Sequence, residues 1–251
     1  MSGSRQLRVV TYNIHKGFSQ FNQRLVLHDI REHLAKVGAD VAFLQEVVGE
    51  DRGHAQRHRE RWPSVGQHAY LCHEDSHHAY GMNAVHQHGH YGNAIVSRFP
   101  IASWENLDIS HHRLENRGLL HTEISVPGWK EKLHCINVHL GLWARSRRFQ
   151  LEWLSDRIRE AVPDGEPLVV AGDFNDWQRK ASAVLGRELG LFEAFERHEG
   201  SHARSFPARL PMLHLDRIYV RGMDVEGVQK LVGAPWAKLS DHVALAATLR
   251  R

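Results

Sequence analysis

The sequence predicts a single α/β domain, and three features carry that prediction. Short apolar runs such as residues 41–44 and 168–171 have the length and composition of buried strands. Stretches with apolar residues at helical spacing, such as residues 23–36, alternate with these runs. The chain has 251 residues, of which 42% are hydrophobic and 24% charged, and no linker divides it. We therefore expect residues 1–251 to form one domain with a sizeable core.

The N-terminal part has the pattern of a strand, a helix and a second strand. Residues 7–12 form an apolar run that is followed by Asn13. The helix predicted over residues 23–36 leads to the strand predicted over residues 41–44, which is followed by Glu46. This order favours a parallel β-α-β unit with a polar residue after each strand.

The next segment, residues 49–90, loses this periodicity. Seven histidines lie among glycine, aspartate and tyrosine in its second half: His68, His73, His77, His78, His86, His88 and His90. Their spacing matches no zinc pattern with two paired ligand sets. We expect long functional loops here rather than a dedicated metal site.

The middle of the chain predicts several strands in succession. Residues 91–98 and 101–107 are predicted to be adjacent strands, and strand-like patterning continues over residues 120–126 and 133–138. His139 directly follows the last of these runs. It is a further polar residue at the end of an apolar strand.

The stretch GDFND, residues 172–176, follows the strand predicted over residues 168–171. It presents the oxygen-bearing side chains of Asp173, Asn175 and Asp176 where a rigid sheet can hold them against a substrate. The alternative is a polar turn in which Asp176 caps the next helix. The same arrangement at other strand ends favours the first interpretation.

The C-terminal part adds three more polar residues of this kind. Asp216 lies within a predicted strand, and Asp241 and His242 lead into the last one. The remaining elements are expected at residues 145–161 and 178–188 for helices, and at residues 214–220, 225–232 and 240–249 for strands.

Carboxylates dominate the polar residues at these strand ends, and cysteine is absent from them. The set is Asn13, Glu46, His139, Asp173, Asn175, Asp216, Asp241 and His242. Two like charges about 4 Å apart repel by roughly 4 kcal/mol at an effective dielectric constant near 20, so clustered carboxylates need a cation or a proton. Oxygen ligands suit Mg²⁺ or Mn²⁺ better than zinc.

Six motifs in order, TYNIH, LQEV, NVHL, GDFN, LDRIYV and SDH, resemble those of the endonuclease/exonuclease/phosphatase superfamily with the DNase I-like fold. The resemblance covers essentially the whole chain and is strongest to small bacterial members of unassigned substrate. It implies an α/β fold in the form of a four-layer α/β sandwich, with two mixed β-sheets packed face to face and helices outside.

The resemblance also implies a role for each motif residue. Glu46 is the principal metal-binding carboxylate, and Asn13 and Asp241 contribute to the metal region, which would hold Mg²⁺ or Mn²⁺. Asp173 orients or deprotonates the attacking water, and Asn175 holds a phosphate oxygen.

The two histidines complete this set of roles. Asp216 is similar to the aspartate that fixes the tautomer of the histidine in SDH, here His242. His139 resembles a second histidine near the scissile phosphate. His15 departs from the DNA-repair members, which place an aspartate there, and this departure disfavours a repair function.

Each of these residues also has a structural interpretation. Asp216 suits a capping or salt-bridging aspartate, His139 a histidine at a sheet edge, and Glu46 a surface charge. Their joint occurrence in order favours catalysis. Four arginines are weaker candidates for phosphate binding, because arginines at such positions are commonly only solvated: Arg98, Arg117, Arg145 and Arg148.

The predicted function is a metal-dependent hydrolase of phosphodiester bonds that uses an Asp-activated water, with a nuclease or related phosphodiesterase as the leading subtype. Nucleic acid and lipid headgroups are the candidate substrates. The alternatives are a phosphomonoesterase for sugar or inositol phosphates on the same scaffold, and a catalytically silent binding module. Specificity depends on loops such as residues 49–90, which carry no readable code.

Composition sets the expected setting of this chemistry. The net charge of +3 gives only a mild preference for polyanions. Cys72 and Cys135 are the only cysteines, so a disulfide framework is not expected. The N-terminus lacks a hydrophobic signal core, and no run of about 18 apolar residues occurs. We expect a cytoplasmic protein without a transmembrane segment, and a monomer is favoured.

Overall fold

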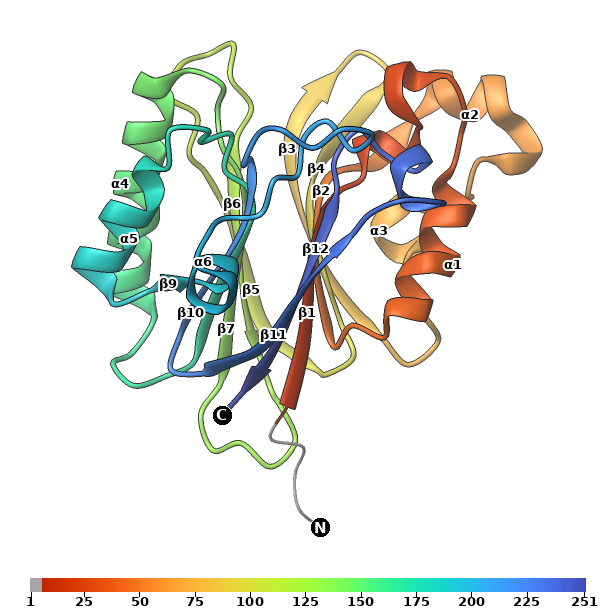
Figure 1. The fold of residues 1–251 in the computed structure, drawn as a ribbon. Coiled ribbons are helices and arrows are strands. Elements are labelled where there is room, and N and C mark those ends of the chain that lie inside the picture. Colours follow the sequence, from red (N-terminus) through yellow and green to blue (C-terminus); the bar gives the residue numbers. More distant parts are fainter. Residues whose placement is uncertain (1–5) are drawn as a thin grey trace.

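The structure is a computed structural model that describes residues 6–251. Twelve strands form two six-stranded mixed sheets that pack face to face (Figure 1). Helices α4 and α5 cover the outer face of one sheet, and α1 and α3 lie outside the other (Figure 1). The expected four-layer α/β sandwich is therefore confirmed.

The first sheet is built around the two parallel strands that the N-terminal pattern predicted. β1 and β2 pair in parallel, and α1 connects them. All other pairs in this sheet are antiparallel. Across the sheet the strands are β11 (Asp224–Leu231), β12 (Ala244–Arg250), β1 (Gln6–Asn13), β2 (Val41–Asp51), β4 (Gly89–Ser97) and β3 (His77–His86).

The second sheet repeats this plan. β7 and β8 pair in parallel and are connected by α4, and the remaining pairs are antiparallel. Across the sheet the strands are β5 (Ile101–Asp108), β6 (Gly118–Ile124), β7 (Leu133–His139), β8 (Leu168–Asp173), β10 (Asp216–Arg221) and β9 (Phe192–Glu193).

The helices follow the amphipathic patterns in the sequence. α1 and α5 end at Gly38 and Gly190, whose positive φ angles suit the left-handed C-terminal position. The α-helices are α1 (Leu27–Val37), α2 (Arg52–His58), α3 (Gln67–Tyr70), α4 (Ala144–Ala161), α5 (Lys180–Leu189) and α6 (Ala194–Glu199). The 3₁₀-helices are η1 (His15–Gly17), η2 (Gln20–Asn22), η3 (Arg59–Arg61) and η4 (Trp236–Lys238).

The main core lies between the two sheets. Val9 and Phe43 of the first sheet belong to one buried cluster with Cys135 and Val169 of the second. Burial of such apolar area stabilises the fold by roughly 25 cal/mol per Å². Asn137 crosses this layer and donates hydrogen bonds to the carbonyls of Leu44 (2.9 Å) and Ala94 (2.8 Å). This buried amide fixes how the sheets are aligned, because a shift of either sheet would leave it unpaired.

The prediction of loops over residues 49–90 was wrong. The segment contains the end of β2, the helices α2, η3 and α3, the whole of β3 and the start of β4. β3 is an edge strand with half of its residues exposed, so its sequence lacks the apolar alternation that reveals a strand. Of the seven histidines named for this segment, His73 and His88 lie outside helices and strands, and the other five lie in α3, β3 or β4.

Three smaller expectations also need correction. The strands predicted at residues 91–98 and 101–107 follow each other in the chain, but β4 and β5 belong to different sheets. Asp216 begins β10 rather than lying within it. The short elements β9 and α6 were not predicted, because two and six residues are too few to show a period.

Two further findings concern the cysteines and the length of the apolar helices. Cys72 and Cys135 are both free. No helix within residues 6–251 is both long and apolar enough to cross a membrane.

Candidate active site

The predicted polar residues meet at one edge of the sandwich, the upper edge in Figure 1. The strand register explains this convergence: Asn13 lies opposite Gln45, while Asp173 lies opposite both His139 and Asp216. The two sheets are joined here by the Asn13 amide, which donates to Asp173 Oδ2 at 3.3 Å. Residues more than one hundred positions apart thus share a single site.

Gly172 delivers Asp173 to this edge. Its φ angle is 146°, and a Cβ atom there would lie 1.9 Å from the carbonyl oxygen of Val138 in β7. The close approach of β7 therefore requires glycine, which explains why GDFN begins with that residue. Any side chain would push Asp173 away from His139.

Glu46 is aimed by an irregularity in β2. The register between β2 and β4 shifts between Leu44 and Val47, and Glu46 adopts a φ angle of 54°. A bulge of this kind turns a side chain out of the regular alternation of a strand. Asn175, with a φ of 49°, is also left-handed. Such strained backbone at one edge is typical of functional sites.

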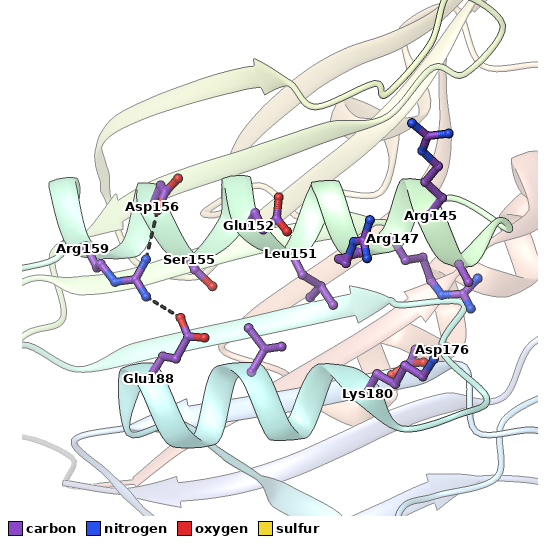
Figure 2. Close-up of a pocket in the computed structure, with 13 residues that line it drawn as sticks. Arg145, Arg147, Leu151, Glu152, Ser155, Asp156, Arg159, Asp176, Lys180 and Glu188 are labelled. Atoms are coloured by element: carbon purple, nitrogen blue, oxygen red, sulfur yellow. Dashed lines mark hydrogen bonds and ion pairs between the residues drawn. The ribbon is translucent and has the colours of Figure 1, made fainter.

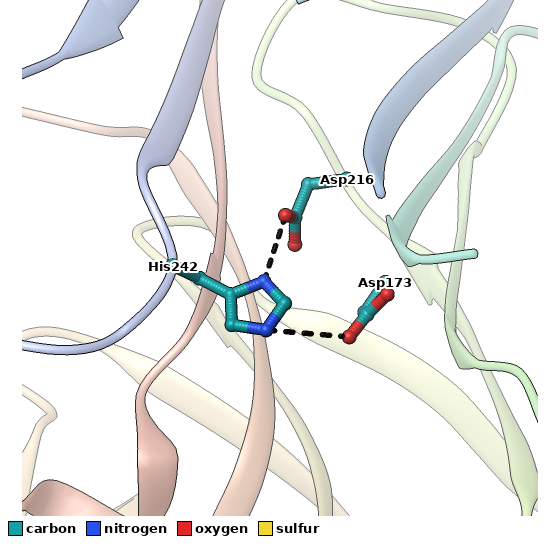
Figure 3. Close-up of side chains that lie close together, drawn as sticks. All are labelled: Asp173, Asp216 and His242. Carbon is teal, nitrogen blue, oxygen red and sulfur yellow. Dashed lines mark hydrogen bonds and ion pairs between the residues drawn. The ribbon is translucent and has the colours of Figure 1, made fainter. Parts of the chain in front are cut away.

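His242 bridges the carboxylates of Asp216 and Asp173 (Figure 3). Its Nδ1 lies 2.9 Å from Asp216 Oδ2, and its Nε2 lies 3.8 Å from Asp173 Oδ2. Burial favours the neutral ring, but the two carboxylates outweigh it and raise the pKa of His242 to about 10. The ring is therefore an imidazolium at neutral pH, with Nε2–H directed into the site.

Asp173 lies at the centre of the site. Burial raises the pKa of its carboxyl to about 6, and Asp216 adds to this rise while His242 opposes it. The backbone N–H of Asn175 donates to Oδ1 at 2.9 Å. A carboxylate with this pKa accepts a proton more readily than an ordinary aspartate while remaining largely ionised at pH 7.

His139 faces Asp173 from β7, with Nε2 3.5 Å from Asp173 Oδ2. Burial, and then the positive charge of Arg117, lowers the pKa of His139 well below its ordinary value. The ring is therefore neutral and offers one N–H. The Asp173 carboxylate is thus flanked by a cationic histidine, His242, and a neutral one, His139.

Glu46 and Asp241 form the acidic part of the site nearest to β1. Burial would raise the pKa of Glu46, but His139, Lys16 and His15 lower it to about 2. Its Oε2 accepts a hydrogen bond from Lys16 Nζ at 3.0 Å. Asp241 Oδ1 lies 3.2 Å from Nδ1 of His15, and this hydrogen bond overcomes burial and lowers the Asp241 pKa. Both carboxylates are ionised at neutral pH.

A divalent cation fits the region around Glu46. The Lys16 ammonium shows that a positive group is accommodated there, and Asn13 Nδ2 lies 3.4 Å from Glu46 Oε1. One carboxylate, an amide, water and substrate oxygens are a common ligand set for Mg²⁺. Asp241 reaches this region through His15, so its contact with Glu46 is indirect.

A second group, formed by Asp173, Asp216 and His242, has ligand atoms within 4.8 Å of one another. It has enough donors for a metal ion. However, His242 Nδ1 is hydrogen-bonded to Asp216, and the raised pKa keeps the ring protonated. A protonated imidazole has no lone pair for a metal. We therefore infer that the positive charge of His242, and not a metal ion, offsets the charges of Asp173 and Asp216.

The site opens into a cavity of about 340 Å³. Asn13, Glu46, His139, Asp173, Asn175 and His242 line it together with Tyr91, Trp177 and Phe206. Arg117 also lines it, whereas Arg98 pairs with Asp40 at 3.2 Å. Asp216 lies behind His242 and does not reach the cavity wall.

A larger cavity of about 800 Å³ lies between α4 and α5, where Arg145 and Arg148 lie (Figure 2). Arg159 closes one end of it through Asp156 and Glu188. At the other end Arg147 packs 4.6 Å from the Trp177 ring. This cavity contains none of the buried carboxylate and histidine pairs, so its greater size does not make it the reaction site.

A sequence profile of the Endonuclease/Exonuclease/phosphatase family matches residues 10–242. The chain belongs to this family. Members of the Endonuclease/Exonuclease/phosphatase family are hydrolases, many of which act on phosphodiester bonds. The match runs from β1 to His242 and so includes every strand end described above.

Individual relatives agree with this assignment. The uncharacterized protein YbhP of Escherichia coli (strain K12) is 44% identical over 243 residues, which are 96% of this chain and 95% of that protein. An endonuclease/exonuclease/phosphatase from Beutenbergia cavernae has a TM-score of 0.75 at 19% identity, covering 98% of this chain and 72% of its own. D. rerio TDP2 complexed with single strand DNA product has a TM-score of 0.73 at 20% identity, covering 98% and 99%. At these identities the two structures show the shared fold alone.

The sequence missed two contacts of the site, those of Lys16 and Tyr91. Lys16 follows TYNIH immediately, and its position three residues after Asn13 was the only signal for it. Tyr91 gave no signal, because its place at the cavity depends on the pairing of β2 with β4, where it lies opposite Val48. Both contacts depend on tertiary geometry.

Proposed function

We propose that this protein is a metal-dependent phosphodiesterase that hydrolyses its substrate with a water activated by Asp173. The observation that carries the proposal is the buried chain Asp216–His242–Asp173 at the cavity floor, with Glu46 on the opposite sheet. Family membership supports the reaction class. The roles of the individual residues are our inference.

In this mechanism Asp173 accepts the proton from the water. Its Oδ1 is held by the Asn175 N–H, while Oδ2 lies 3.3 to 3.8 Å from three nitrogen donors, from Asn13, His139 and His242. Those distances are long for hydrogen bonds, so Oδ2 retains capacity for a water. The water, oriented by the carboxylate, attacks phosphorus as the P–O bond to the leaving alcohol breaks, and the leaving oxygen takes up a proton from solvent.

Preorganised donors then stabilise the charge that develops on the non-bridging oxygens. His242 offers Nε2–H and a full positive charge, and Asp216 fixes its orientation. Asn175 uses one amide hydrogen on the Leu140 carbonyl at 2.9 Å and has a second one free. His139 adds a neutral N–H.

Glu46 and Asn13 would hold the metal ion, with Asp241 supporting them through His15. A divalent Mg²⁺ or Mn²⁺ bound there supplies Lewis-acid neutralisation of phosphate charge. Lys16 is half-buried on Glu46 and would give way to a cation bound there. The acidic edge is thereby neutralised both with and without metal.

A nuclease or a related phosphodiesterase suits this arrangement better than a phosphomonoesterase. A monoester chiefly needs cationic clamping, whereas a diester needs a positioned nucleophile and donors for new charge. Asp173, His242 and Asn175 provide the second set. The solved TDP2 complex holds single strand DNA product, which supports nucleic acid as one substrate class. A silent binding module is disfavoured by the cost of retaining buried carboxylates.

The direct test is hydrolysis of a panel of nucleic acids, lipid diesters and phosphate monoesters. We expect turnover of at least one diester class with Mg²⁺ or Mn²⁺ and loss of turnover with a chelator. Equal activity in the chelator would contradict the metal dependence. Turnover of monoesters alone would favour the phosphatase alternative.

The variant Glu46→Gln tests the metal assignment. We expect metal affinity to fall at least about tenfold, because one charged oxygen ligand is lost, and turnover to fall with it. Isothermal titration calorimetry gives the affinity. Glu50→Gln, an exposed change near the C-terminal end of β2, is the matched control. Wild-type affinity in Glu46→Gln would remove this residue from the metal site.

A further inference from the structure

The rim of the catalytic cavity carries an unusual share of exposed apolar side chains. Of the fourteen large hydrophobic residues most exposed in the described chain, seven lie in four loops. These loops lie at the catalytic edge. Residues 109–117, 140–143 and 174–179 follow β5, β7 and β8, and residues 206–215 precede β10. They contain only a small part of the chain, so the enrichment is local.

We call this surface the apolar rim. It consists of Leu114, Leu142, Trp143, Trp177, Leu210, Met212 and Leu213. Leu114 is 90% exposed, Trp143 72% and Leu210 67%, so these side chains point into solvent instead of packing. Three other members, Leu142, Trp177 and Leu213, also line the catalytic cavity. The apolar rim is therefore continuous with the site of the reaction.

Three of the loops contain an exposed arginine within two residues of an apolar tip, Arg113, Arg179 and Arg209, and exposed Arg145 lies in the first turn of α4, two residues after Trp143. None of these four side chains has an ion-pair partner in the described residues. The two acidic groups of the loops are engaged, since Glu115 accepts from Gln150 at 3.0 Å and Asp176 is buried. On these four loops the surface is thus apolar and positive.

We propose that the apolar rim docks on an anionic phospholipid bilayer and presents the cavity to lipid headgroups. Leucine, methionine and tryptophan beside arginine are the side chains that enter the headgroup region of such membranes. The docking stands on the rim itself. The substrate class that follows from it, a phosphodiester in a phospholipid headgroup, rests on the proposed function.

Single-stranded nucleic acid is the competing partner, and the rim fits it less well. Bases stack on the faces of aromatic rings, but five of the seven rim residues are aliphatic. One face of Trp177 is already covered by the Arg147 guanidinium, 4.6 Å from the ring centre. Exposed leucine tips offer no stacking face, whereas they gain free energy by leaving water in a bilayer.

The test is flotation of the purified protein with vesicles of phosphatidylcholine alone and with about one third phosphatidylglycerol. We expect flotation with the anionic vesicles and at least tenfold weaker partitioning of the double variant L210N/M212N, because each apolar side chain buried in the bilayer contributes on the order of tenfold. Arg113→Gln should weaken binding to anionic vesicles by about fivefold. Circular dichroism checks that each variant is folded.

Trp104→Ser is the matched control, because Trp104 is 54% exposed on β5 but lies outside the rim. It should float like the wild type. Absence of wild-type flotation, or equal loss in Trp104→Ser and in L210N/M212N, would overturn the proposal. If the wild type bound oligonucleotides but no vesicles, and L210N/M212N lost the oligonucleotide binding, the apolar rim would be a nucleic-acid-binding surface and the proposal would be wrong.

This readout is independent of catalysis. Flotation needs neither metal nor turnover, while hydrolysis of a soluble diester by the wild type needs no membrane. A protein that floats but hydrolyses nothing would contradict the proposed function and leave the docking intact. A protein that hydrolyses soluble diesters but does not float would contradict the docking and leave the proposed function intact.

Discussion

At the residue scale, the site consists of groups whose charges are set by their neighbours. Asp173 and His139 are pushed toward neutrality by burial, whereas Asp216 and Asp173 keep His242 cationic. Asp173 as a base and the His242 imidazolium as a cation can therefore be present together in the catalytic cavity near neutral pH. The assignment makes the pH dependence of turnover a direct probe of these groups.

The first prediction concerns the acidic limb of the pH profile. The Asp173 pKa is raised to about 6, so the active carboxylate is lost as pH falls through 6 and gained as pH rises through it. We expect kcat for a soluble diester to rise about tenfold per pH unit below this value and then level off. The measurement is a stopped assay from pH 4.5 to 8.5. A limb near the ordinary aspartate pKa of about 4 would contradict the role of Asp173.

The second prediction concerns Asp216, a positioning residue that acts through His242. Asp216→Asn removes the charge that raises the His242 pKa, so the imidazolium is lost at lower pH. We expect kcat to fall at least about tenfold with little change in KM. We also expect the alkaline limb of the profile to move toward neutral pH. A purely structural role would lower stability and leave that limb in place.

At the element scale, each catalytic group depends on a local feature of its strand. β8 reaches β7 only because Gly172 has no side chain, and β2 turns Glu46 out through its bulge. The sequence revealed both strands by their apolar runs. It did not reveal the bulge, because a shifted register appears only when β4 is paired against β2.

The same reasoning explains which elements could be predicted. β1, β7 and β8 are buried on both faces, so continuous apolar runs identify them. β3 is half exposed and α2 has no buried residue, and both contain histidine and glycine without a hydrophobic period. The order of motifs predicted the eight site residues, but the contacts of Lys16 and Tyr91 depend on tertiary packing.

A buried chain on the second sheet gives an element-scale prediction about stability. Arg157 Nε donates to His121 Nδ1 at 3.3 Å, His121 Nε2 lies 2.9 Å from His134 Nδ1, and His134 Nε2 lies 2.6 Å from Glu166. Because Nδ1 of His121 accepts a hydrogen bond, this ring is neutral. Burial, with His134 and Arg157, lowers its pKa to about 3.

The pKa of His121 is lower in the folded chain than in the unfolded chain. The free energy of unfolding therefore decreases as the pH is lowered, because the unfolded chain binds the proton first. Stability from His121 is fully present above about pH 6.5 and is lost progressively toward pH 3. Between pH 7 and 5 the loss is about 2 kcal/mol. Urea unfolding at both pH values should show a smaller change in His121→Gln than in the wild type. His198→Gln, an exposed change on α6, should behave like the wild type, and equal slopes in all three proteins would refute the account.

At the scale of the whole molecule, the fold separates stability from chemistry. The core between the sheets holds the register, while the loops at one edge hold the site and the apolar rim (Figure 1). The four-layer architecture was implied by the resemblance of the six motifs to the family. That residues 1–251 act as one domain, and as a monomer, remain predictions from the sequence.

The central claim is that this edge is built for diesters, with Asp173 as the base. The most direct measurement compares kcat/KM for bis(p-nitrophenyl) phosphate and p-nitrophenyl phosphate with Mg²⁺ or Mn²⁺, in the wild type and in Asp173→Asn. We predict faster turnover of the diester and a loss of at least about 10² in its kcat in the variant, the scale of removing one preorganised catalytic group. A monoester preference that survives purification controls, or wild-type diester turnover in Asp173→Asn, would contradict the claim.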